Sequence, residues 1–282
     1  MKSRLPLAIL AVAAAGLATV VVIARPGRHD ARTVPPPPPG PPGRASVEPP
    51  APPPPPAPNA ASSIADRILA ARDPFALKGV DPATALSADE IARLCELVRG
   101  SAPAHQRMIA LMFLARQKDP DGRILAAIRD AAGARELEVA HKALECLGDY
   151  ADAHPDRARE AHGLLFARAL GEGDVETRSA AAGAIRFDRL DAADEAQFAR
   201  LFSDPSLELR AAAIDVAGAA KERKADAAKL LSAAFRAERT LEVRTAIAES
   251  LWHLDAPSLA ALKGVAPDMD PIIDKLLASP RD

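Results

Sequence analysis

Two groups of side chains in this sequence have residue types suited to chemistry. The first is Glu138-Val-Ala-His141, and the second is the pair of cysteines, Cys95 and Cys146. A Glu-x-x-His sequence on a helix supplies part of a di-iron site, which also needs a second such sequence and further glutamates on facing helices. The chain contains only this one Glu-x-x-His sequence. We therefore expect neither a metal site nor a cofactor.

The two cysteines lie on different expected helices that are not neighbours in the chain. Helices of this kind rarely bring two Cα atoms within the roughly 6 Å that a disulfide needs. We expect two buried free thiols, with a disulfide as the alternative.

Sequence motifs of common enzymes are missing. The chain has no Gly-x-Ser-x-Gly, no Gly-rich phosphate-binding loop and no Cys-x-x-Cys, so we do not expect an enzyme. Residues 60–282 contain 30 basic and 36 acidic residues, and a single tryptophan. A nucleic-acid-binding protein usually carries a basic stripe, so we expect no nucleic-acid partner.

The elements that position these residues are expected to be helices. The sequence is 49% hydrophobic but only 3% aromatic, so its core must consist mainly of Ala, Leu, Ile and Val. Ala and Leu favour helices, and the aromatic residues that favour strands are scarce. Ser87-Ala-Asp-Glu90 has the spacing of a capping box at a helix start. The sequence therefore predicts an all-α fold.

A repeated pattern organises these helices. Segments beginning at Leu137, Val175, Leu207 and Leu241 each have an apolar residue, Glu, an apolar residue or Thr, usually Arg, and then an Ala-rich helix. The fourth positions, Arg107, Ala140, Arg178, Arg210 and Arg244, are 33, 38, 32 and 34 residues apart. This period is typical of stacked helical hairpins. We expect five hairpins, whose first helices are Ser87 to Arg99, Asp121 to Ala132, Pro155 to Leu170, Asp191 to Phe202 and Ala225 to Ala237.

These segments resemble HEAT repeats, in particular the short bacterial HEAT-like repeats also found in phycobilin lyases (PBS lyases). The segments that carry the resemblance are Leu207-Glu-Leu-Arg-Ala-Ala-Ala-Ile, Leu241-Glu-Val-Arg-Thr-Ala-Ile-Ala and Val175-Glu-Thr-Arg-Ser-Ala-Ala-Ala. The resemblance covers about residues 85–255 and implies an α-solenoid. It implies little about function, because this repeat serves many roles. A lyase-type enzyme is the alternative function that it suggests.

The repeated Glu and Arg are expected to have a structural role. The glutamate lies in the first turn of each second helix, where negative charge is favourable. With the arginine two residues later it is expected to form a ladder between repeats, made of Glu138, Glu176, Arg178, Glu208, Arg210, Glu242 and Arg244.

The face of the second helices opposite the core is mostly acidic, with small residues between the charges. It carries Lys142, Glu145, Asp149, Asp215, Glu249 and His253. In HEAT-like solenoids this face usually lines the concave side, where partners bind. We expect it to receive a protein partner with a basic segment, and a merely solvated charged face is the alternative. Trp252 is expected either to pack beneath a C-terminal cap, residues 257–264 and 271–277, or to anchor a partner.

The N-terminal region differs from the rest of the chain. Leu5 to Ala24 is a run of 20 residues without a charge, flanked by basic residues on both sides. At about 1.5 Å per residue, such a helix would span the roughly 30 Å hydrocarbon core of a bilayer. We expect residues 1–28 to be a single-pass anchor in a bacterial inner membrane, with the remaining chain in the periplasm. A cleaved signal, and hence a secreted protein, is the alternative.

Residues 29–61 form an expected disordered linker before the solenoid domain, residues 62–282. Fifteen of the 27 prolines lie between Pro35 and Pro58, and such runs extend as polyproline II by about 3.1 Å per residue. We expect a stalk, with a docking ligand for aromatic grooves as the alternative. Together these features predict a membrane-tethered HEAT-repeat scaffold for protein–protein interaction in the cell envelope.

Overall fold

The computed structural model describes residues 63–73, 77 and 79–280. The chain divides into two units, residues 1–55 and 56–282, and every described residue belongs to the second unit. The apolar segment 5–24 and the proline-rich linker lie outside the described residues. None of the described helices is long and apolar enough to cross a membrane.

The described residues form thirteen α-helices and one 3-10 helix, and they contain no strand. Ten of the helices make five hairpins. The first helices are α2 (Ala88–Arg99), α4 (Arg123–Ala132), α6 (Ala158–Ala169), α8 (Ala192–Leu201) and α10 (Lys224–Ala237). The second helices are α3 (Ala104–Leu114), α5 (Leu137–Ala153), α7 (Val175–Gly183), α9 (Leu207–Gly218) and α11 (Leu241–Leu254). An all-helical, solenoid-like fold is thus confirmed, and the ends of the first helices differ from those expected by at most three residues.

Four further elements complete the described part. α1 (Ile64–Leu69) precedes the first hairpin, and the 3-10 helix η1 (Phe187–Arg189) connects α7 to α8. α12 (Ala256–Ala260) and α13 (Asp270–Ala278) follow the last hairpin and pack on α11. They correspond to the expected C-terminal cap.

Local sequence explains where several helices begin. The Ser87 hydroxyl accepts from the backbone N–H of Glu90, and the Glu90 carboxylate accepts from that of Ser87, so the predicted capping box is present. Asp174 and Ser206 cap α7 and α9 by accepting from backbone N–H groups three residues later. These bonds satisfy N–H groups that have no partner within the helix.

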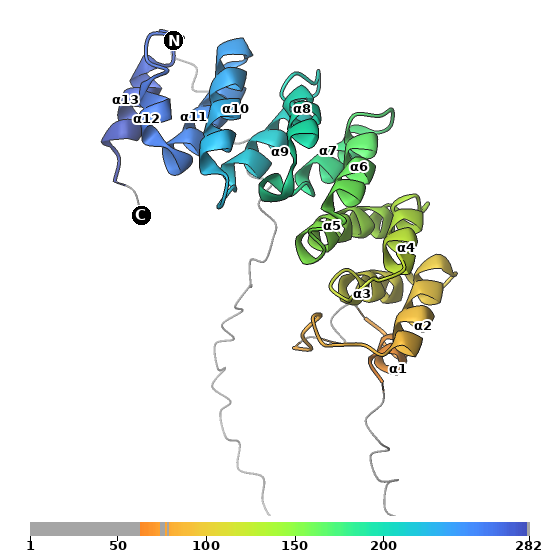
Figure 1. Ribbon diagram of the computed structural model, residues 1–282. Helices are drawn as coiled ribbons and strands as arrows, with labels where there is room; N and C mark the ends of the chain where they lie inside the picture. The colour runs from red at the N-terminus through yellow and green to blue at the C-terminus, as the bar shows by residue number, and fades with distance from the viewer. Residues whose placement is uncertain (1–62, 74–76, 78, 281–282) are drawn as a thin grey trace, which may run out of the picture. The chain divides into compact units, whose positions relative to one another are not determined.

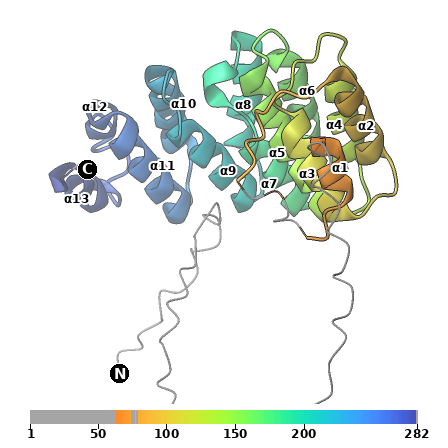
Figure 2. The same ribbon diagram turned by 90° about the horizontal axis from the view of Figure 1, so that it is seen from below.

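The hairpins stack so that first helices form one layer and second helices the other (Figures 1 and 2). The second helices contact one another without interruption from α3 to α11. In the first-helix layer α2 packs on α4 and α6 on α8, but α4 and α6 make at most marginal contact, and so do α8 and α10. Because the first helices are splayed apart where the second helices stay packed, the second-helix layer lies on the inner side.

One continuous apolar core lies between the two layers. Its largest fully buried side chains include Tyr150, Phe166, Phe198 and Phe235, and most other members are Ala, Leu and Ile. A single hairpin could not bury such a surface, whereas stacked neighbours can. The core therefore extends along the array and holds the second-helix face in place.

Candidate functional site: the second-helix face

The sequence indicates the solvent face of the second helices as the binding surface. The structure places its six charged residues on α5, α9 and α11. Between α5 and α9 lies α7, which contributes Ser179, Ala180 and Gly183 to this layer. The six residues therefore form two separate groups instead of one continuous patch.

The group on α5 is engaged in ion pairs. Lys142 pairs with Glu145 one turn away. Asp149 lies 2.8 Å from a guanidinium nitrogen of Arg186 and 3.8 Å from one of Arg116, so it joins the segments that follow α7 and α3. The expected acidic character is thus neutralised at this end of the face.

The group on α9 and α11 is different. Asp215 and Glu249 are both exposed, and neither forms an ion pair or side-chain hydrogen bond within the described residues. Partial desolvation by the surrounding protein raises the pKa of the Asp215 carboxyl. His253 is exposed beside the half-buried Trp252, with ring centroids 4.4 Å apart. This end of the face carries uncompensated negative charge.

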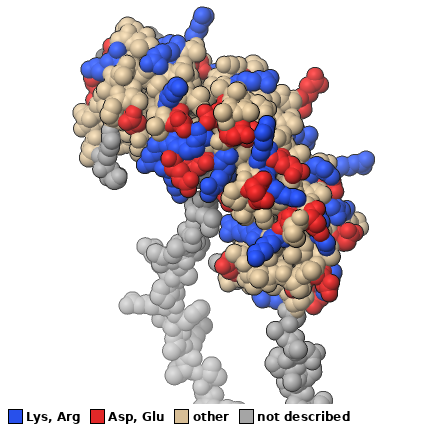
Figure 3. Space-filling model, viewed as in Figure 1, with Lys and Arg blue, Asp and Glu red and all other residues tan. Residues whose placement is uncertain are grey.

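Opposite charges are interleaved over the surface seen in Figure 3. Many of them form ion pairs between hairpins. One chain of pairs runs from Asp149 to Arg186, Asp152, Arg189 and Glu222, across the ends of α5, α7 and α9. Exposed pairs of this kind contribute little individually, but a network of several holds neighbouring loops in register.

The repeated arginines join successive hairpins, but not to the repeated glutamates. Arg178 donates through Nε to the Ala169 carbonyl of its own hairpin, 3.1 Å away, and pairs with Asp204 of the next hairpin. Arg210 donates to the Asp204 carbonyl at 2.7 Å and lies 2.8 Å from Glu238. The Arg210–Glu238 contact is an ion pair in which the Nε–H is not aimed at the carboxylate.

The ends of the array follow the same rule. Arg107 bonds to the Val98 carbonyl and reaches Glu136 at 3.3 Å, and Arg244 reaches Asp268 at 3.6 Å. The row is interrupted in α5, where Ala140 occupies the arginine position. The partner of Arg107, Arg178 and Arg210 is therefore a loop carboxylate just before the next second helix, and that of Arg244 is a carboxylate just before α13.

Because the repeated arginines pair with loop carboxylates, the expected ladder between the repeated glutamates and arginines is wrong. Glu138, Glu176, Glu208 and Glu242 each occupy the second residue of a second helix, as expected. None of them forms an ion pair among the described residues. The Ser206 hydroxyl donates to Glu208 and lowers the pKa of that carboxyl. The negative charge of these glutamates interacts favourably with the positive, N-terminal end of their own helix, and they do not bridge repeats.

Sequence reasoning missed a buried carboxylate between hairpins. The side chain of Asp119, in the loop after α3, is fully buried. It accepts from the backbone N–H groups of Ile124 and Leu125 and from the Tyr150 hydroxyl, at 2.9–3.1 Å. Arg157 lies 3.7 Å away. The only signal for it in the sequence is an Asp a few residues before a helix.

A second buried pair, His162 and Asp194, was also missed. His162 Nδ1 lies 3.7 Å from Asp194 Oδ2, and neither atom has a hydrogen-bond partner within the described residues. Burial lowers the pKa of His162 to about 4 and raises the pKa of Asp194. Both side chains are nearly inaccessible to water, so a dissolved substrate has no path to them.

The other residues whose types are suited to chemistry are the two cysteines, Glu138 and His141, and their positions indicate a structural role. Cys95 and Cys146 are free and buried, as expected, and burial raises the pKa of both thiols. Glu138 and His141 lie at the start of α5, where His141 Nε2 is 3.4 Å from the Thr177 hydroxyl. Within the described residues, no group of three or more His, Cys, Asp and Glu could hold a metal ion.

Comparison with known proteins does not assign this chain to a family. No protein-family model matches the chain, and no curated protein matches it in sequence.

Proposed function

We propose that this chain is a HEAT-like protein-interaction module whose second-helix face binds a basic segment of a partner protein. The observation that carries the proposal is the unpaired state of Asp215 and Glu249 on adjacent second helices. In the last turns of α5, by contrast, Asp149 and Asp152 are neutralised by Arg186 and Arg189. A lysine- or arginine-bearing segment would supply the missing positive charge.

The neighbourhood of these carboxylates supports the same proposal. Ala211 and Ala212 of α9 and Ala219 directly after it lie near Asp215 in sequence, so a partner backbone could approach closely. Trp252 and His253 lie one helix away and offer aromatic surface of the kind that is enriched at binding hot spots.

The proposed module is tethered to a membrane. The uncharged run Leu5 to Ala24 is long enough to be a single-pass anchor, and the prolines of residues 29–61 favour an extended stalk. In this proposal the anchor lies in a bacterial inner membrane and the solenoid in the periplasm.

The proposal can be tested by crosslinking and affinity capture with the full-length chain. The variant is Asp215→Lys with Glu249→Lys, which reverses both unpaired charges without breaking an ion pair of the described residues. The matched control is Asp156→Lys with Glu172→Lys, which makes the same charge change at exposed positions outside the second helices. We expect a partner captured by the wild type and the control to be lost from the variant. Capture of the same partners by all three proteins would contradict the proposal.

A further inference from the structure

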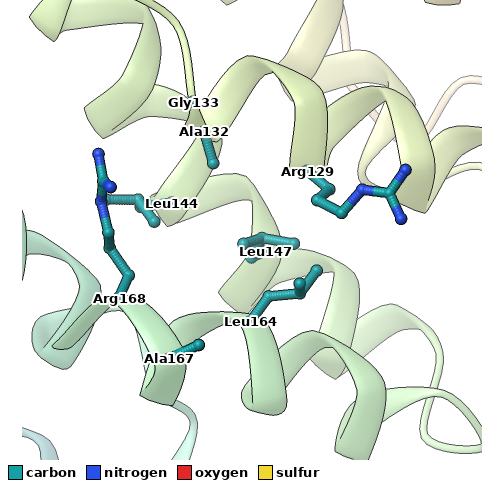
Figure 4. Close-up of a pocket in the computed structure, with 8 residues that line it drawn as sticks. All are labelled: Arg129, Ala132, Gly133, Leu144, Leu147, Leu164, Ala167 and Arg168. Atoms are coloured by element: carbon teal, nitrogen blue, oxygen red, sulfur yellow. The ribbon is translucent and has the colours of Figure 1, made fainter. Parts of the chain in front are cut away.

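The outer layer of the array contains a shallow cavity between α4 and α6. α4 and α6 are separated there, and the cavity between them has a volume of about 260 Å³ (Figure 4). Its floor is Leu144 and Leu147 of α5, and Leu164 of α6 forms one wall. The small residues Ala132, Gly133 and Ala167 leave the entrance wide. The cavity therefore opens on the side opposite the proposed second-helix surface, where the half-buried Leu164 is more accessible than Leu144 and Leu147, each 1% exposed.

Two arginines flank this apolar floor. Arg129 of α4 and Arg168 of α6 lie on opposite sides of the cavity (Figure 4). Arg129 is 3.5 Å from its neighbour Asp130, a carboxylate that also binds Arg99. Arg168 is exposed and has no ion pair or side-chain hydrogen bond within the described residues. The rim thus has an excess of positive charge and an unused guanidinium, whose planar donors suit a carboxylate.

Arginine at this position recurs through the array. A last-turn arginine is present in each first helix: Arg99, Arg129, Arg168, Arg200 and Arg236. Positive charge is favourable at the end of a helix, so the arginines alone do not identify a site. The Arg129–Arg168 pair, in addition, is separated by an open apolar cavity. This combination of charge and apolar depth is what a ligand would recognise.

The size of the cavity limits the occupant. Sites for small-molecule ligands usually measure about 300–1,000 Å³, so this cavity suits one large side chain better than a complete small ligand. We propose that it receives an apolar side chain of a second partner segment, with an Asp or Glu of that segment bound by Arg168. The occupant differs in charge from the basic segment proposed for the second-helix face, and it binds the opposite layer.

The test uses the full-length chain and displayed random 12-residue peptides as probes. Enriched peptides are synthesised, and their affinities are measured by fluorescence anisotropy. We expect enrichment of Leu, Ile, Met or Phe within about four positions of Asp or Glu. The variant Arg168→Glu should weaken binding at least tenfold, and Ala167→Trp, which fills the cavity, should abolish it.

The control is Arg200→Glu, because Arg200 is exposed at the end of α8 and has no ion pair within the described residues. It should change affinity less than twofold. A peptide whose Glu is replaced by Lys should bind Arg168→Glu better than it binds the wild type. Arg168→Glu alters an exposed side chain, so the test stands even if Ala167→Trp fails to fold.

Several results would overturn this proposal. One is enrichment of peptides without carboxylates, and another is the absence of any enriched peptide. A third is an equal effect of Arg168→Glu and Arg200→Glu on peptide affinity. The fourth is tighter binding of decanoate than of any peptide, which would assign the cavity to an amphiphilic anion. Loss of peptide binding in Asp215→Lys with Glu249→Lys would move the peptide to the other face. Since the two surfaces share no residue, failure here leaves the second-helix proposal unaffected.

Discussion

The repeated arginine of the second helices contacts two hairpins at once. Its guanidinium has several donors in one plane, so it can bond a carbonyl at the end of its own first helix, or in the loop after it, and a carboxylate of the next hairpin. In Arg178 and Arg210 the side chain is largely buried, with 16% and 12% exposed, and so are the partner carboxylates. At this depth the loss of one partner leaves the other charge without compensation.

Replacement of Arg210 by Met should destabilise the array. Glu238 would keep its charge at 10% exposure, and the Asp204 carbonyl would lose its donor. We expect a loss of about 2–3 kcal/mol in the free energy of unfolding, measured by urea denaturation. Arg200→Met removes an exposed arginine and should change stability by less than about 0.5 kcal/mol. Equal effects of the two substitutions would show that the ladder does not contribute.

The buried His162 predicts a dependence of stability on pH. Its pKa is about 4 in the folded protein and about 6.5 in an unfolded chain. The unfolded state therefore takes up a proton first as the pH falls, and stability is lost between about pH 6.5 and 4. The raised pKa of Asp194 acts in the opposite direction, because its protonation at low pH favours the folded state.

The expected net loss between pH 7 and 4.5 is about 2 kcal/mol, measured by urea denaturation at a series of pH values. His162→Gln keeps an acceptor for the Arg186 backbone N–H, which is 3.4 Å from His162 Nε2, but does not titrate in this range. It should flatten the profile. An unchanged slope in His162→Gln would assign the pH dependence to another group.

At the scale of elements, the close packing of α5 on the end of α7 depends on a glycine. Gly148 is buried within α5, and a Cβ at this position would lie 2.2 Å from the Ala184 carbonyl oxygen. No ordinary contact is so short, so one of the two helices would have to move. Gly163 of α6 has no atom within 4 Å of the same point. Both glycines are inside helices, and only their packing distinguishes them.

Substitution by Ala should therefore have opposite effects at the two positions. Gly148→Ala should lower stability by about 2 kcal/mol or more, because overpacking forces the backbone to shift. Gly163→Ala should raise it by about 0.5–1 kcal/mol, because Ala has the higher helix propensity. Thermal unfolding of the two variants measures both changes. A stabilising Gly148→Ala would mean that α5 and the end of α7 are farther apart than the Cβ–oxygen distance of 2.2 Å requires.

At the scale of the whole molecule, the two helix layers differ in how continuously their helices pack. The continuous second-helix layer offers an uninterrupted surface, whereas the splayed first-helix layer has an opening over α5. Stacked repeats contact only their neighbours, so such differences arise locally without disturbing the rest of the array.

The proposed tether belongs to the same scale. The full chain should sediment with membranes and resist extraction by high salt and alkali, since a 20-residue apolar run holds by the hydrophobic effect and not by charge. N-terminal sequencing of the mature protein should find residues 5–24 retained. A soluble protein that begins beyond Ala24 would instead indicate a cleaved signal and secretion.

Much of the fold could be predicted from the sequence because its signals are local. The capping box at Ser87, the helix starts and the repeat of the Arg position all depend on residues within one or two turns of each other. The buried free thiols followed from the same helical stripes. The six residues of the candidate face lie on second helices, as expected, but the sequence does not show which of their charges are paired.

The sequence by itself determined the helices of the hairpins and the number of hairpins, since helical periodicity and capping act over a few residues. Only the tertiary structure decided which charges meet: Asp204 and Glu238 receive the arginines, Asp149 is neutralised, and Asp215 and Glu249 are left unpaired. It also decided where α4 and α6 separate. These outcomes depend on how one hairpin is rotated against the next, and that rotation results from packing between residues about thirty positions apart.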